Sequence, residues 1–209
     1  MSEDKTLGTN ESFDLKKILW DRLKWLGFII ILGSFSSSML MGVSSLLPID
    51  EEELDQETKL LILNALDMEY TTDDAEQVFD ENITIEEFEE MTFYKNKEGS
   101  IAFEFTGRGH QDSISGIVAL GPDLESIKGL VILEQAETPG LGGRITETEF
   151  LKQFRSVTLD PDLRIVRGGT AATADNEVEG ITGATRTSQA LEEMLNQSIQ
   201  EALQVRGLN

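Results

Sequence analysis

The chain has 209 residues and a formal net charge of −22, because 39 acidic residues outnumber 17 basic ones. Such a negative charge argues against a protein that binds nucleic acid through its phosphates. The absence of cysteine excludes disulfides, cysteine-ligated metal centres and thiol nucleophiles.

The chain has one histidine, His110, around which any serine-type catalytic triad would have to be built. No nucleophile elbow lies near it, so we interpret His110 as a polar loop residue. We therefore expect neither a catalytic residue nor a metal site in this chain.

The first predicted element is an uncharged segment over residues 25–49. A helix of that length exceeds the ~30 Å hydrocarbon core of a bilayer. A cleaved signal peptide is the main alternative, but its apolar stretch would span only ~7–15 residues and end at a small-residue cleavage site. This segment instead ends in Leu46-Leu47-Pro48, so we predict a retained transmembrane helix.

The charges that flank this segment predict its orientation. Residues 1–24 supply basic residues before the span, and acidic residues 50–53 follow it. Because basic residues remain on the cytoplasmic side, we expect a single-pass protein of the inner (plasma) membrane. Residues 1–24 would form a cytoplasmic N-terminus with an interfacial helix, and the chain from about residue 50 onward would be extracytoplasmic.

Residues 50–95 are predicted to form an acidic helical connector. The apolar residues of 51–68 recur among acids in the pattern of an amphipathic helix, and 69–92 favour a short helix plus loops. A solvated surface is the ordinary explanation for this charge.

Residues 96–209 are predicted to form an α+β domain of antiparallel sheet plus helices. Strand patterns cover 101–105, 113–120 and 127–133, and the last two are expected to pair across the turn at 121–123. A short helix over 149–154 and a strand over 163–166 follow. Apolar residues then recur at helical spacing from Leu191 to Leu203, which predicts a C-terminal helix.

The first segment with chemical character is Gly180-Ile181-Thr182-Gly183-Ala184-Thr185-Arg186-Thr187-Ser188, directly before that helix. A turn of small and hydroxyl residues at a helix start presents free backbone N–H groups, which suit a phosphate. Taken alone, the pattern also fits an ordinary N-cap at Thr182 or Thr187.

The second segment is Glu137-Thr138-Pro139-Gly140-Leu141-Gly142-Gly143, which follows a strand. Its proline and three glycines predict a sharply bent loop with exposed backbone. Such loops often line ligand sites, although a plain connecting turn explains this segment equally well by itself.

Together, these segments and the N-terminal anchor resemble the FMN-binding subunits of two related membrane redox complexes. One is the ion-translocating ferredoxin:NAD oxidoreductase, through its G subunit. The other is the sodium-translocating NADH:quinone oxidoreductase, through its C subunit. The resemblance extends over about residues 15–205 and is strongest over 99–190.

The resemblance implies covalent FMN, joined by a phosphoester to Thr185, the last residue of the motif Thr182-Gly183-Ala184-Thr185. A flavin transferase would attach it, because a threonine hydroxyl is a weak nucleophile without an adjacent base. The implied cofactor-binding residues are Thr182, Gly183 and Ala184 of the motif and Thr187 just after it, together with Glu137, Thr138, Pro139, Gly140, Leu141 and Gly142 of the loop.

Two positions depart from the family pattern. Glu179 stands where the family commonly has an aspartate, three residues before Thr182, so a carboxylate is kept but lies one methylene further out. His110 follows Gly109 where the family favours an aromatic residue, and we assign it no stacking role.

The resemblance implies an electron-relay subunit of an oxidoreductase, with the other subunits of the complex as partners, and not a complete enzyme. Chain length favours the G subunit of the ferredoxin complex, because the C subunit of the quinone complex is usually longer. The alternatives are that C subunit, a membrane-tethered flavin sensor or binding module, and an anchored acidic domain without a cofactor.

Overall fold

The computed structural model describes residues 20, 22–30, 32 and 54–207, and the chain divides into two units, Met1–Glu53 and Leu54–Asn209. In the first unit, residues 20, 22–30 and 32 are helical. No helix among the described residues is long and apolar enough to cross a membrane. Most of the predicted transmembrane segment (25–49) and of the predicted cytoplasmic N-terminus (1–24) lies outside the described residues.

The second unit begins with the helices α2 (Gln56–Ala65) and α3 (Ala75–Asn82). Asp55 caps α2, because its side chain accepts a hydrogen bond of 2.7 Å from the backbone N–H of Thr58. The helix predicted over 51–68 is therefore present in a shorter form.

A six-stranded antiparallel sheet follows, in which each strand pairs with the next one along the chain. Its strands are β1 (Ile83–Phe88), β2 (Met91–Asn96), β3 (Ile101–Arg108), β4 (Ser113–Leu120), β5 (Ser126–Gln135) and β6 (Val157–Thr158). The predicted pairing of β4 with β5 is confirmed, with Val118 opposite Leu130.

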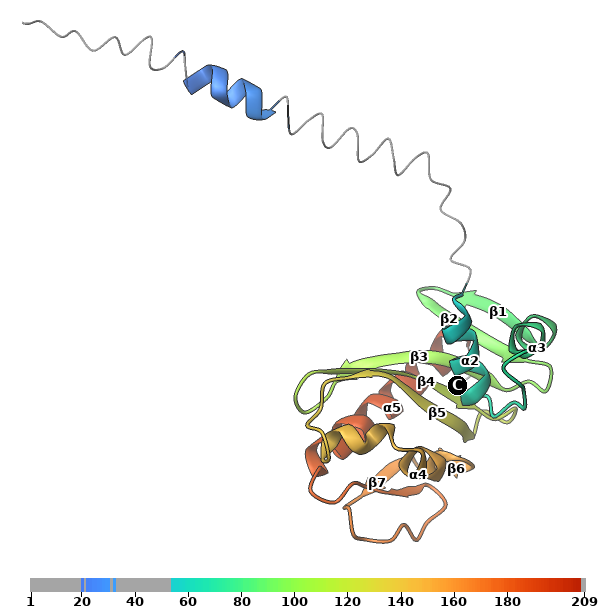
Figure 1. Ribbon diagram of the computed structural model, residues 1–209. Coiled ribbons are helices and arrows are strands. Elements are labelled where there is room, and N and C mark those ends of the chain that lie inside the picture. Colours follow the sequence, from blue (N-terminus) through green and yellow to red (C-terminus); the bar gives the residue numbers. More distant parts are fainter. Residues whose placement is uncertain (1–19, 21, 31, 33–53, 208–209) are drawn as a thin grey trace, which may run out of the picture. The chain divides into compact units, whose positions relative to one another are not determined.

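The sheet buries side chains on both faces, because successive residues of a strand point in opposite directions. In β3, Ala102 joins the cluster around α2, whereas its neighbour Phe103 joins the cluster that contains the C-terminal helix α5 (Thr185–Val205). Helices therefore lie on both faces of the sheet (Figure 1).

Between β5 and α5 the chain forms a series of short elements, some of which contact β5 and others α5. They are η1 (Gly142–Thr146), α4 (Thr148–Leu151), η2 (Lys152–Phe154), β7 (Arg164–Val166) and β8 (Glu177–Glu179). Strands β7 and β8 form a separate parallel pair. The α+β class with an antiparallel sheet is confirmed.

One segment differs from its sequence-based prediction. The pattern of residues 69–92 predicts a short helix plus loops, but β1 occupies 83–88 and pairs with β2 along its whole length. This strand lies at the edge of the sheet, where Glu87 is exposed and Glu86 is partly buried. Charged residues are tolerated at sheet edges, and in β1 they obscure the alternation of apolar and polar residues by which a strand is predicted from sequence.

Candidate functional site

A cavity of about 480 Å³ lies where the two predicted segments meet. The loop after β5 forms one wall, and the turn that leads into α5 forms another. Nine of the eleven predicted site residues line it: Glu137, Thr138, Leu141, Gly142, Thr182, Gly183, Ala184, Thr185 and Thr187. Pro139 and Gly140 belong to the same loop but do not line the cavity.

Glu137 joins the two walls of this cavity. Its side chain is buried (4% exposed) and accepts a 2.6 Å hydrogen bond from the hydroxyl of Thr187. Its other oxygen accepts a 2.8 Å bond from the backbone N–H of Gln111. One carboxylate therefore fixes three segments that lie far apart in the sequence, and the Thr187 hydroxyl points to Glu137.

The absence of a side chain at Gly142 leaves room for the hydrogen bond between Glu137 and Thr187. A Cβ atom at this position would lie only 2.5 Å from the Thr187 hydroxyl oxygen and 2.7 Å from a carboxylate oxygen of Glu137. Real Cβ atoms do not make such contacts, so any other residue would have to displace the hydrogen bond between those two side chains.

Thr185 is the first residue of α5, and its side chain is exposed. The turn before it requires a left-handed backbone at Gly183, where φ is +83°. Ala184 is the N-cap residue, and no side chain caps this helix. The alternative N-cap roles for Thr182 and Thr187 are therefore not observed, and the helix start is left open beside Thr185.

Glu179 makes hydrogen bonds to two other segments, which the sequence does not predict. One of its carboxylate oxygens accepts a 3.0 Å bond from the backbone N–H of Gly169. Its backbone N–H and C=O both bond to the side chain of Gln153. Glu179 therefore fastens the 168–169 loop next to the motif.

The cavity also contains residues that the sequence patterns do not assign to it. They are His110, Gln111, Arg167, Gly168 and Arg186. For His110 the sequence predicts only an ordinary loop residue. The small-residue run that begins at Gly168 gives only a weak signal, and nothing in the sequence indicates that Arg167 lies near Thr185.

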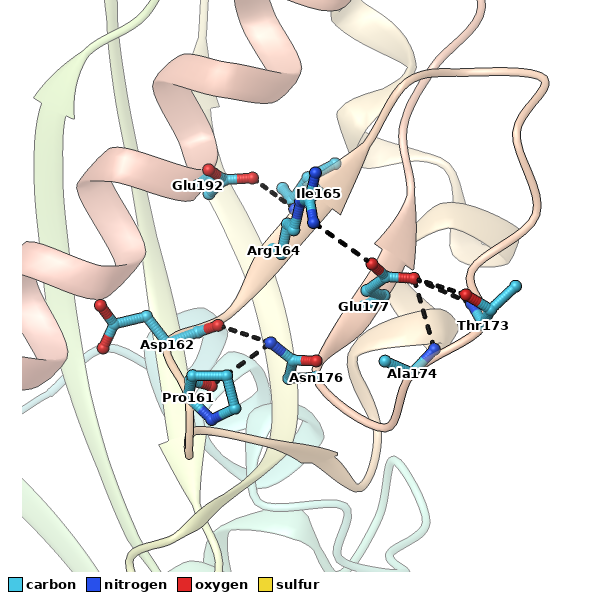
Figure 2. Close-up of polar contacts among 9 residues, drawn as sticks. All are labelled: Pro161, Asp162, Arg164, Ile165, Thr173, Ala174, Asn176, Glu177 and Glu192. Atoms are coloured by element: carbon cyan, nitrogen blue, oxygen red, sulfur yellow. Dashed lines mark hydrogen bonds and ion pairs between the residues drawn. The ribbon is translucent and has the colours of Figure 1, made fainter.

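A second cavity of about 600 Å³ adjoins the first and shares Arg167, Gly168 and Thr185 with it. It lies between one side of α5 and the segment that carries β7 and the following loop. Figure 2 shows the polar contacts of this region, in which Glu192 of α5 accepts a hydrogen bond from the backbone N–H of Ile165.

Glu177 organises the loop of the second cavity. Its carboxylate accepts bonds from the backbone N–H groups of Thr173 (2.9 Å) and Ala174 (3.3 Å), and Arg164 lies 3.7 Å away (Figure 2). The bond from the Thr173 N–H is the main cause that lowers the pKa of Glu177 below its ordinary value of 4.5.

Comparisons with known proteins bear on the same region. Residues 109–200 match the family model described as the FMN-binding domain. The chain is 31% identical over 111 residues to the C subunit of the Na(+)-translocating NADH-quinone reductase of Pasteurella multocida, which is half of this chain and 43% of that protein. It is 33% identical over 91 residues to the C subunit of the same reductase from Vibrio anguillarum, or 41% of this chain and 36% of that protein. The matches thus span well under half the length of these curated relatives.

Solved structures of proteins with the same name share the fold. Shewanella oneidensis NqrC aligns with a TM-score of 0.58 at 18% identity, over 71% of this chain and 96% of that chain. The structure of the C subunit from Parabacteroides distasonis gives 0.58 at 20% identity, over 71% and 90%. The region that contains both cavity walls and Thr185 is therefore similar in sequence to FMN-binding domains, and 71% of the chain shares the fold of these solved structures.

Proposed function

We propose that this chain carries FMN on Thr185, through a phosphoester, and transfers electrons as a subunit of a membrane oxidoreductase. The observation that supports this most is the position of the Thr185 hydroxyl. It is exposed, it stands at a helix start that no side chain caps, and it lines a cavity together with the predicted glycine loop.

The residues around Thr185 fit a phosphate and a ring system. The first backbone N–H groups of α5 suit an anion. The cavity of about 480 Å³ lies in the range of small-molecule sites, roughly 300–1,000 Å³. Leu141, which is 44% exposed beside Thr138, offers an apolar surface next to polar groups.

Each part of the site has a separate role in this proposal. FMN supplies the electron-transfer chemistry, and the protein supplies attachment and orientation. Thr185 provides the hydroxyl that a flavin transferase would esterify, since no base lies within its motif to activate it. Glu137 and Thr187 hold the loop against α5, and Thr138, Leu141 and Gly142 of the cavity wall would contact the ring.

The comparisons favour one type of complex over the other. The reported relatives are named as the C subunit of a sodium-translocating NADH-quinone reductase, which is the alternative that the sequence leaves open. We therefore propose a subunit of that kind, which receives and passes electrons among the other subunits. The G-type subunit of the ferredoxin complex, which chain length favours, is the second candidate.

In-gel flavin fluorescence of the denatured protein tests the proposed attachment. The chain is produced together with a flavin transferase, as wild type, Thr185→Ala and Thr182→Ala. Wild type and Thr182→Ala are expected to keep a fluorescent band, and Thr185→Ala to lose it. A wild-type band without fluorescence would refute covalent attachment.

A further inference from the structure

We infer that Arg167 and Arg186 are positioning residues that hold the phosphate of the group on Thr185, at the boundary between the two cavities. This inference rests on the proposed function and adds two residues to its site. Neither arginine belongs to the glycine loop or to the hydroxyl residues of the motif.

The two arginines approach Thr185 from different parts of the chain. Arg186 follows it in α5, whereas Arg167 comes just after β7. Both side chains are exposed and line the first cavity, and Arg167 also lines the second. Arg167 and Thr185 therefore both lie where the two cavities meet.

The carboxylates that line these cavities are already bonded to other groups. Glu137 accepts from Thr187 and Gln111. Glu177 accepts from Thr173 and Ala174 and pairs with Arg164. Glu192 accepts from the N–H of Ile165, and these last two sets are drawn in Figure 2. Within residues 54–207, neither Arg167 nor Arg186 has an ion pair among the contacts of 4.0 Å or less.

This arrangement is unusual for so acidic a chain. Acidic residues outnumber basic ones by 39 to 17, yet the first turn of α5 contains no acid and does contain Arg186. A cation is unfavourable next to the positive end of a helix dipole, and an anion is favourable there. A phosphate at Thr185 would satisfy both arginines and the helix start together, through charge-assisted hydrogen bonds.

The position of Arg167 also has a consequence for the ring. Two arginines bound to the phosphate would fix the direction in which the rest of the attached group extends from Thr185. With Arg167 removed, the group is free to enter either cavity, because both open on Thr185. The ring of the loaded protein is then expected to be more mobile.

The test uses inorganic phosphate and the full-length chain purified without flavin. Its affinity for phosphate is measured from the rise in melting temperature, against chloride at equal ionic strength. We expect Arg167→Gln and Arg186→Gln each to weaken phosphate binding at least about tenfold, as for the loss of a hydrogen bond to a charged group. Arg108→Gln is the matched control, since Arg108 is exposed, its replacement removes the same charge, and it lines neither cavity.

A control that weakens binding as much as Arg167→Gln would overturn the inference, because net charge alone would then explain the effect. Wild type that binds phosphate no better than chloride would overturn it too. A second arm measures fluorescence anisotropy of the flavin-loaded chain, where Arg167→Gln is expected to lower the anisotropy of the flavin that is attached. If the wild type carries no covalent flavin, the proposed function fails and the inference with it. If the wild type carries the flavin but neither arginine variant weakens phosphate binding, the inference alone fails.

Discussion

At the scale of single residues, the site depends on one buried carboxylate. Glu137 accepts hydrogen bonds from Thr187 and from the N–H of Gln111. We expect Glu137→Ala to lower the free energy of unfolding by about 1–3 kcal/mol, because two donors lose a buried acceptor. Denaturant titration measures this change.

Glu134→Ala provides the control for Glu137. Glu134 is exposed on the preceding strand, and an exposed substitution of this kind changes stability by about 0.5 kcal/mol or less. Equal losses in the two variants would contradict the structural role given to Glu137.

Glu177 gives a prediction about pH. Its folded-state pKa is lowered from 4.5, chiefly by the N–H of Thr173, so ionised Glu177 stabilises the native chain above that pH. This contribution is lost as the pH falls through the folded-state value. Glu177→Gln is therefore expected to lose less stability than wild type between about pH 5 and pH 3. Urea unfolding across that range measures it, and a steeper loss in the variant would contradict it.

The sequence predicts much of the site but little of its connections. The small and hydroxyl residues around Thr185 and the glycines of the 137–143 loop are visible as patterns. The bond between Glu137 and Thr187 joins residues 50 positions apart, and no spacing rule reports such a contact. Arg167 escapes prediction for the same reason, because only the fold brings it to Thr185.

At the scale of elements, the C-terminal end of α5 is tied to the edge of the sheet. Arg206 lies 2.7 Å from a carboxylate oxygen of Glu86 in β1, and its guanidinium lies 5.0 Å from the ring centres of Phe88 and Phe93. The helix that begins at Thr185 is therefore fastened at its far end.

We expect Arg206→Ala to cost about 1–3 kcal/mol, because it removes both a largely buried ion pair and the ring contacts. Hydrogen exchange should quicken at the amides of β1. The control is Arg155→Ala, whose pair with Asp67 is half exposed and therefore contributes roughly 0–1 kcal/mol. Unchanged exchange in β1 would show that this contact does not hold the edge strand.

The elements with strong periodicity are predictable from the sequence, and those without it are not. The alternating or apolar runs of β3, β4 and β5 and the apolar stripe of α5 give clear signals. Strand β1 combines acids with partial exposure, and β8 has only three residues. Both acquire their strand geometry from a partner strand, which the local sequence does not specify.

At the scale of the whole molecule, the proposal places the second unit outside the cytoplasm on a membrane anchor. That placement rests on the uncharged segment 25–49 and on the charges that flank it. The full-length chain is expected to stay in the membrane fraction after alkaline washing. Protease added to the periplasmic side should release a fragment that contains Thr185.

Release of the chain by alkaline washing would rule out the anchor. Digestion only when the protease has access to the cytoplasmic side would show the opposite orientation. Neither result would alter the site around Thr185, since every residue of that site belongs to the second unit.

The central claim is the covalent attachment of FMN to Thr185, and peptide mass spectrometry tests it most directly. Trypsin cleaves after Arg167 and Arg186, so residues 168–186 form one peptide with threonines at 170, 173, 182 and 185. For chain produced with a flavin transferase, we predict the mass of that peptide plus one esterified FMN, with fragment ions that assign it to Thr185. An unmodified peptide, or FMN on another threonine, would contradict the account.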